Sequence, residues 1–136
     1  MYWPTFTSEF LQSIAKGLKK RSKALKHKSW EFKCERVLEQ GQRDKQEKLE
    51  FDIRCFGENR DTFIRLFVWD DRWAWIDARE SAKKEQLFEW DYEGRLLGDV
   101  GPQRVVTALE ETLERRQPED LDSVWRELLA NGPQKV

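Results

Sequence analysis

The sequence of 136 residues has one histidine, two cysteines and no run of about 18 apolar residues, the length that a membrane-spanning helix needs. That absence excludes a helical membrane protein. The start of the chain, Met1–Thr5, lacks the basic and apolar stretches of a secretory signal. Two cysteines are too few for a disulfide scaffold and fit a reducing compartment. We therefore expect a cytoplasmic protein with no membrane partner.

The scarcity of histidine and cysteine also limits the available chemistry. His27 lies within a lysine-rich run and has no identifiable serine or cysteine partner, which is typical of a solvated surface residue. Cys34 and Cys55 fall on the inward phase of two neighbouring predicted strands. One histidine and two cysteines match no zinc-ligand pattern, so we interpret both thiols as buried and unreactive. We expect no metal and no cofactor.

Carboxylates are common in the chain, with 26 acidic residues in total. Several lie close together between residues 70 and 91 and could supply a general acid and base. At this density such clusters arise by chance, and Asp70 and Asp71 already have a role as turn formers. The sequence leans away from an enzyme without excluding one.

Aromatic residues are plentiful, with 7 Trp and 8 Phe. Because each buries roughly 150–250 Å², a few of them can close the core of a small domain. The length fits one domain over residues 1–136, with residues 131–136 as a flexible tail. Charge is separated along the chain. Residues 1–48 hold 12 Lys/Arg and 6 Asp/Glu, a net of +6, whereas residues 49–136 hold 13 and 20, a net of −7.

Apolar spacing predicts a helix over about residues 7–26, with Thr7 or Ser8 as its N-cap. Alternation then predicts a strand around residues 30–34 and another over residues 49–55, separated by a polar loop at 39–47. A register that pairs Cys34 with Cys55 would set Arg36 against Ile53 and Leu38 against Phe51.

The runs 63–69 and 73–78 have large apolar side chains on both faces, with Asp70-Asp71-Arg72 as the turn between them. A three-residue turn pairs Phe67 with Trp75 and Arg65 with Asp77. This register places aromatic rings together and opposite charges side by side. The aliphatic residues then occupy the other face.

A fifth strand is predicted over Gln86–Tyr92, a helix begins at Pro102 and a last helix begins at Pro118 and ends near Asn131-Gly132-Pro133. The predicted order is α-β-β-β-β-β-α-α. Short connections between strands favour an antiparallel meander, so the fold class is α+β.

The aromatic side of the 63–78 hairpin allows two interpretations. In one it belongs to the core, because the C-terminal helices cover it while the N-terminal helix covers the other face, or the reverse. In the other, part of it stays exposed and binds a partner, since Trp and Arg dominate binding hot spots. The candidate residues for a protein partner are Arg65, Trp69, Asp70, Asp71, Trp73, Trp75, Asp77 and Arg79.

The leading hypothesis is a small protein-binding domain, for example an inhibitor or immunity-type protein that engages a basic partner. The first alternative is nucleic-acid binding through a basic helix, with bases stacked on exposed Trp rings. Its candidate residues are Lys16, Lys19, Lys20, Lys23 and Lys26. The second alternative is a ligand carrier or enzyme with a pocket between sheet and helix. Exposed sheet edges would also allow a homodimer.

Overall fold

The computed structural model describes residues 3–25, 30–41, 44–56, 61–82, 85–98, 100–115 and 118–130. His27 and the predicted tail at 131–136 lie outside these residues. The elements are α1 (Glu9–Leu25), β1 (Trp30–Gln40), β2 (Lys45–Phe56), β3 (Asp61–Trp69), β4 (Trp73–Ala82), β5 (Glu85–Arg95), α2 (Pro102–Arg115) and α3 (Pro118–Leu128). The predicted α+β order is confirmed.

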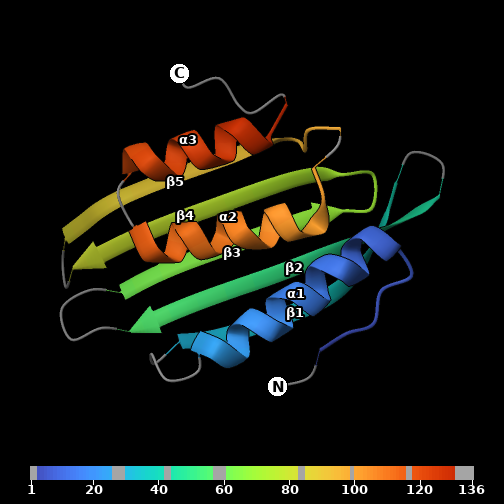
Figure 1. The fold of residues 1–136 in the computed structure, drawn as a ribbon, viewed down its shortest axis with the longest axis horizontal. Coiled ribbons are helices and arrows are strands. Elements are labelled where there is room, and N and C mark those ends of the chain that lie inside the picture. The colour runs from blue at the N-terminus through green and yellow to red at the C-terminus, as the bar shows by residue number, and fades with distance from the viewer. Residues whose placement is uncertain are drawn as a thin grey trace.

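The five strands form one antiparallel sheet in chain order, β1-β2-β3-β4-β5. All three helices lie on the same side of this sheet, with α1 near β1 and β2, α2 in the middle and α3 beside β5 (Figure 1). We call the helix-covered side the inward face and the other side the outward face. Among the described helices, none has the length and apolar character needed to cross a membrane.

Alternation along the strands explains the inward face. The side chains that β3 and β4 bury there, each at most 2% exposed, are Ile64, Leu66, Val68, Ala74, Ile76 and Ala78. The helices bury their apolar stripes against the same layer through Leu11, Ile14, Leu18, Val105, Val106, Leu109, Val124, Trp125 and Leu128. Burial of one such aliphatic side chain contributes about 1.5–3 kcal/mol to stability. The apolar layer between the helices and the inward face is therefore the hydrophobic core.

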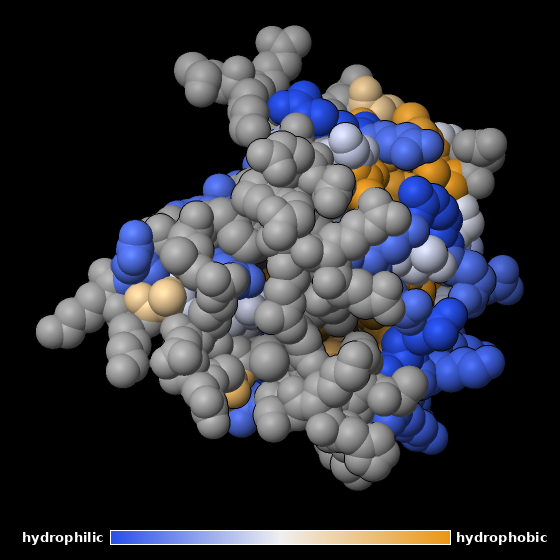
Figure 2. Space-filling model, turned by 60° about the vertical axis from the view of Figure 1, so that its left-hand side comes forward, coloured by the Kyte–Doolittle hydropathy of each residue, from blue (hydrophilic) through white to orange (hydrophobic). Residues whose placement is uncertain are grey.

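The outer surface of the helices is polar. In Figure 2, hydrophilic residues drawn blue form most of the described surface on the right, toward which the helical layer of Figure 1 turns, and hydrophobic residues drawn orange appear between them. Each helix therefore has one apolar side, which it turns to the sheet. The described side chains of these helices form no second apolar side that could cover another layer.

The predicted coverage of both sheet faces is wrong. The outward side chains of β3 and β4, including Phe63, Phe67, Trp69, Trp73 and Trp75, are partly exposed rather than buried. The sequence of the β3–β4 hairpin alone does not explain why these side chains are exposed. The reason lies in the flanking strands, because the outward positions of β1, β2 and β5 are mostly charged and would be costly to bury under a helix.

The hairpin between β1 and β2 is longer than predicted. The expected loop at 39–47 is wrong, because β1 continues to Gln40 and β2 already starts at Lys45. The register pairs Cys34 with Phe51, so the pairing of the two cysteines is also wrong. Arg36 and Leu38 instead lie opposite Leu49 and Glu47. Polar residues on the inward phase concealed the extension of both strands.

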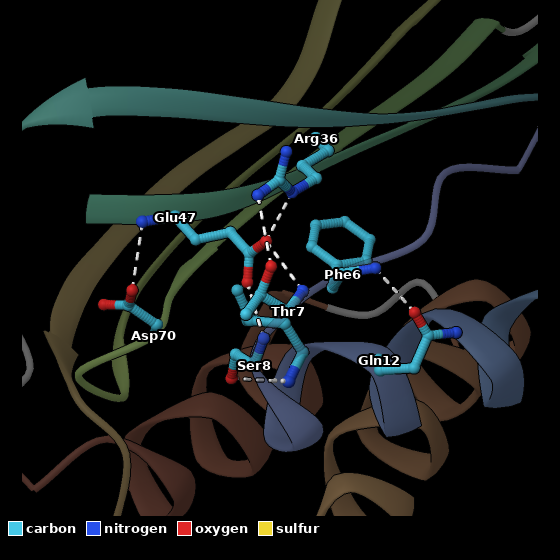
Figure 3. Close-up of polar contacts among 8 residues, drawn as sticks. Phe6, Thr7, Ser8, Gln12, Arg36, Glu47 and Asp70 are labelled. Atoms are coloured by element: carbon cyan, nitrogen blue, oxygen red, sulfur yellow. Dashed lines mark hydrogen bonds and ion pairs between the residues drawn. The ribbon is translucent and has the colours of Figure 1, made fainter. Parts of the chain in front are cut away.

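Glu47 explains why this polar stretch forms a strand. Its carboxylate accepts the backbone N–H of Thr7 at 2.9 Å and of Ser8 at 2.8 Å, and it also pairs with Arg36 (Figure 3). These N–H groups precede α1, and the predicted cap is confirmed because Ser8 Oγ accepts the N–H of Leu11 at 3.3 Å. Glu47 is thus a polar core residue that anchors the start of α1 to the sheet.

The turn between β3 and β4 matches the prediction. Phe67 pairs with Trp75 and Arg65 with Asp77. The N–H of Arg72 bonds to the carbonyl of Trp69 at 3.0 Å, and Arg72 has φ 72°, the left-handed conformation of the last residue in a three-residue hairpin loop. The sheet is therefore in the register that separates aromatic from aliphatic side chains.

Arg72 also connects the turn to the segment that follows β5. Its carbonyl accepts the N–H of Leu96 at 2.9 Å, and its guanidinium donates to the carbonyls of Leu97 (3.3 Å) and Val100. The same guanidinium lies 4.5 Å from the centre of the Phe10 ring on α1. One side chain thus links the β3–β4 turn, the approach to α2 and the first helix.

The fifth strand runs from Glu85 to Arg95 and so exceeds the predicted Gln86–Tyr92. Tyr92 is buried on the inward face at 2% exposure. The predicted helices at Pro102 and Pro118 are confirmed. The predicted end of the last helix at Asn131-Gly132-Pro133 lies outside the described residues.

Candidate binding face

The outward face is crossed by rows of side chains that the strand register aligns from β1 to β5. The three central rows are Glu35–Glu50–Phe67–Trp75–Glu93, Lys33–Asp52–Arg65–Asp77–Asp91 and Glu31–Arg54–Phe63–Arg79–Glu89. In each row the aromatic or arginine-bearing centre is flanked by acidic residues on β5. The face therefore combines rings with an acidic edge.

The aromatic rings on this face contact one another. The centroids of Phe67 and Trp75 are 4.9 Å apart with an interplanar angle of 36°, and Phe67 also meets Trp69 edge-on at 6.3 Å. Such pairs add about 0.5–1.5 kcal/mol beyond the area that they bury. These contacts thus restrict the positions of the rings, although no helix among the described residues covers them.

Lys48 fixes one end of this ring cluster. Its Nζ lies 4.9 Å from the ring centre of Phe67 and 5.4 Å from that of Trp69, and it forms ion pairs with Glu39 and, at 2.9 Å, Glu50. Burial alone would lower the pKa of Lys48, but its hydrogen bonds to these two carboxylates outweigh that effect and raise it. With a side chain 10% exposed, Lys48 supports the rings from beneath and is not presented to a partner.

Two indoles are tied to the acidic edge. Trp73 Nε1 donates to Glu93 Oε1 at 2.9 Å, and Trp75 Nε1 donates to Asp91 on the same strand. These bonds orient both rings, and they hold carboxylates next to the ring faces. Ring faces and carboxylates both attract cations.

Asp77 lies in the middle of the outward face, between Arg65 and Asp91 in the register. Burial of its carboxyl raises its pKa, and the charge of Asp91 raises it further against the opposing charge of Arg79. The carboxyl thus sits where negative charge is less favourable than in water, although the charges of Arg79 and Arg65 offset part of that effect. An added positive charge beside it would lower its pKa.

The structure places six of the eight residues predicted for a protein partner on the outward face. These are Arg65, Trp69, Trp73, Trp75, Asp77 and Arg79. The turn residues Asp70 and Asp71 have structural contacts instead. Asp70 accepts the N–H of Glu47 at 3.0 Å, and Asp71 accepts the N–H of Trp73 at 3.1 Å.

Sequence reasoning left out the β2 and β5 members of this face. Lys48 and Arg54 from β2 and Glu93 from β5 occupy outward positions beside the aromatic hairpin. Alternation marks them as outward, but their neighbours follow only from the register between strands. Extending the register from the well-defined β3–β4 hairpin to the next strands would have found them.

The basic helix is well separated from the aromatic rings. Lys16, Lys19, Lys20 and Lys23 are exposed on α1, in the helical layer, whereas Lys26 lies outside the described residues. Because α1 covers the inward face, a nucleic acid on these lysines would not reach the outward rings. The nucleic-acid hypothesis needs the lysines of α1 and the exposed Trp rings to bind the same strand, and the structure places them on opposite sides of the sheet.

Of the two predicted cysteines, the structure describes the side chain of Cys34. Cys34 is a free, buried thiol, and burial, aided by the charge of Glu35, raises its pKa to about 12. The side chain of Cys55 lies outside the description. Within the described chain no three His, Cys, Asp or Glu side chains are grouped to hold a metal.

A small apolar hollow lies between helices and sheet, lined by residues that include Leu18, Phe51 and Val106. Its volume of about 10 Å³ is room for a single water molecule. Sites for small molecules measure roughly 300–1,000 Å³, so this hollow gives no support to a ligand carrier. Comparison with models of protein families, with curated proteins and with solved structures finds no match to this chain.

Proposed function

We propose that this chain is a protein-binding domain whose outward sheet face takes a basic partner. The observation that carries the proposal is the pair of indoles, Trp73 and Trp75, held on an uncovered face by the carboxylates of Glu93 and Asp91. Rings of this kind supply most of the energy at protein interfaces. Carboxylates beside them favour lysine and arginine from the partner.

The charge of the face supports a basic partner. The aligned outward positions of the five strands hold ten carboxylates and six basic groups, a net of −4. The carboxylates are Glu31, Glu35, Glu39, Glu50, Asp52, Asp61, Asp77, Glu89, Asp91 and Glu93, and the basic groups are Lys33, Lys48, Arg54, Arg65, Arg79 and Arg95. A negative face would repel nucleic acid and attract a positively charged protein.

An inhibitor or immunity-type protein is the concrete form that this surface suits. Such a protein acts by covering a partner's functional surface, and it gains from fast electrostatic association. The preformed ring cluster around Phe67 would need little ordering upon binding, which lowers the entropic cost of association. We propose that the protein performs this role in the cytoplasm.

The direct test is a titration of the whole chain with a lysine- and arginine-rich peptide, followed by NMR. We expect the largest shifts at the indole N–H signals of Trp73 and Trp75, with affinity that falls as salt rises. The double variant Asp91→Asn/Glu93→Gln should weaken binding about two- to tenfold. Glu111→Gln on α2 is the matched control and should leave the affinity unchanged.

Two results would contradict the proposal. One is equal affinity for a glutamate-rich peptide of the same length, and the other is a set of shifts confined to the helical layer.

A pull-down from the source cell then identifies the partner. A stoichiometric protein retained by the natural chain but not by Asp91→Asn/Glu93→Gln is expected, and recovery of none would count against an inhibitor.

A further inference from the structure

Three arginines surround one phenyl ring on the outward face. The guanidinium carbons of Arg54, Arg65 and Arg79 lie 5.0, 5.1 and 5.1 Å from the ring centre of Phe63. Arg54 and Arg79 flank Phe63 in the same cross-strand row, and Arg65 lies two residues further along β3. One ring thus gathers three positive charges from three strands.

Among the described residues, one of the three arginines forms an ion pair. Arg65 pairs with Asp52 at 3.2 Å. Arg54 and Arg79 are exposed, and in the part of the chain that the structure describes neither forms an ion pair. The acidic residues next to them in the row are Glu31 and Glu89. Asp77 lies opposite Arg65, and the charges of Arg79 and Arg65 act on its carboxyl. Carboxylates thus surround the cluster, but among the described residues the guanidinium groups of Arg54 and Arg79 keep N–H donors that no carboxylate pairs with.

Shielding of Phe63 explains one arginine but not three. A cation over an exposed ring gains about 0.5–1 kcal/mol, whereas three like charges around the same ring repel one another. An apolar neighbour would cover the ring without that repulsion. An anion placed among the three guanidinium groups would remove it.

The chemistry of the donors indicates which anion fits. Each guanidinium presents N–H donors in a planar fork that matches phosphate and carboxylate oxygens. A phosphate monoester has three terminal acceptor oxygens, so it can satisfy three converging arginines, whereas a carboxylate has two. The partly exposed ring of Phe63 lies at the centre, where an organic group attached to the phosphate could pack.

We propose that Arg54, Arg65 and Arg79 form a binding site for a phosphate monoester group. This site rests on contacts other than the indole–carboxylate contacts that carry the proposed function, although Arg65 and Arg79 are also among the residues predicted for a protein partner. Phe63 lies four residues along β3 from Phe67, the cross-strand partner of Trp75, which corresponds to about 13 Å. Arg65 also lies 5.8 Å from the ring centre of Phe67, so the site adjoins the ring cluster without including the indoles of Trp73 and Trp75.

The test is an NMR titration of the whole chain with phenyl phosphate, inorganic phosphate and acetate, each at constant ionic strength of about 0.1 M. The arginine Nε–H signals report binding at each side chain separately. We expect saturable shifts at Arg54, Arg65 and Arg79 with phenyl phosphate. Tighter binding of phenyl phosphate than of inorganic phosphate indicates an organic ester, and equal binding indicates that free phosphate suffices.

Variants distinguish a built site from general charge attraction. Arg54→Gln and Arg79→Gln should each weaken phenyl phosphate binding about two- to fivefold, while Arg104→Gln on α2 should leave it unchanged. Shifts that remain linear, or that are equal at all arginines, would overturn the proposal. Binding of acetate as tight as that of phenyl phosphate would overturn the assignment to phosphate esters. Circular dichroism shows whether each variant is folded.

Discussion

Glu47 and Ser8 are 39 residues apart in the sequence, yet the carboxylate of Glu47 accepts the N–H of Ser8 at 2.8 Å. This contact joins the start of α1 to the sheet. Burial alone would raise the pKa of Glu47, but the hydrogen bonds from Thr7, Ser8 and Arg36 outweigh it and lower the pKa. The ionised carboxylate is therefore the form that the fold stabilises.

Replacement of Glu47 by Gln should lower the free energy of unfolding by about 1–3 kcal/mol at neutral pH, because charge-assisted hydrogen bonds are lost. Urea denaturation measures this change. A group whose folded pKa is lowered stabilises the fold above its unfolded pKa, and loses that effect as pH falls through the folded pKa. The difference between the natural chain and Glu47→Gln should therefore shrink in acid. The exposed Glu35→Gln is the control, and an equal loss there would refute a special role for Glu47.

The contact between α1 and α2 depends on the absence of a side chain at Gly17. A Cβ at this position would lie 2.7 Å from Val106 Cγ2, and the buried, β-branched valine has little freedom to move. Gly17→Ala should destabilise the protein although alanine favours a helix by about 1 kcal/mol. Val106→Ala should remove part of that loss when both changes are combined. Strictly additive unfolding energies in the double-mutant cycle would contradict the close contact.

Arg72 combines an unfavourable backbone conformation with favourable side-chain contacts. Arg72→Ala keeps the left-handed backbone and loses the hydrogen bonds to Leu97 and Val100. Arg72→Gly loses the same bonds but removes a conformational cost of about 1 kcal/mol. Both variants should unfold at lower urea than the natural chain, with Arg72→Gly the more stable of the two. The reverse order would show that the turn is not strained at this position.

Cys34 should resist alkylation in the folded protein. Burial raises its pKa to about 12, so almost no thiolate exists near neutral pH. Iodoacetamide labelling followed by peptide mapping measures Cys34 separately from Cys55. We expect labelling at Cys34 to speed up by orders of magnitude in denaturing urea. Equally fast labelling in native buffer would show that the thiol is accessible.

The tryptophans should divide by exposure. Trp125 is 0% exposed, whereas Trp73 and Trp75 are partly exposed on the outward face. Replacing Trp73 and Trp75 by Phe should therefore reduce the fraction of fluorescence that acrylamide quenches. An unchanged quenched fraction in this variant would contradict the exposure of Trp73 and Trp75. Dilution and sedimentation show whether a partner protein or a second copy covers that face.

Prediction from the sequence worked best where the hydrophobic pattern was compatible with a single strand register. In the β3–β4 hairpin, a shift of one residue would have mixed rings with aliphatic side chains, so the pairing of Arg65 with Asp77 could be predicted. Helix starts were equally clear, because Ser8, Pro102 and Pro118 carry local signals.

Prediction failed where one buried polar contact replaced the hydrophobic pattern. Arg36 and Glu47 lie on the inward phase of their strands, and only their contact with the residues before α1 makes that position favourable. The coverage of the outward face was missed for a related reason. It depends on charges in β1, β2 and β5, which the β3–β4 hairpin does not contain.

The placement of every described helix on one side of the sheet has a consequence for how this protein can change. Core closure depends on the aliphatic set that includes Leu66 and Ile76, whose neighbours along each strand point the opposite way. Substitutions at those alternate positions can alter recognition while leaving the packing interior untouched. Related chains could therefore keep this scaffold and diverge in what they bind.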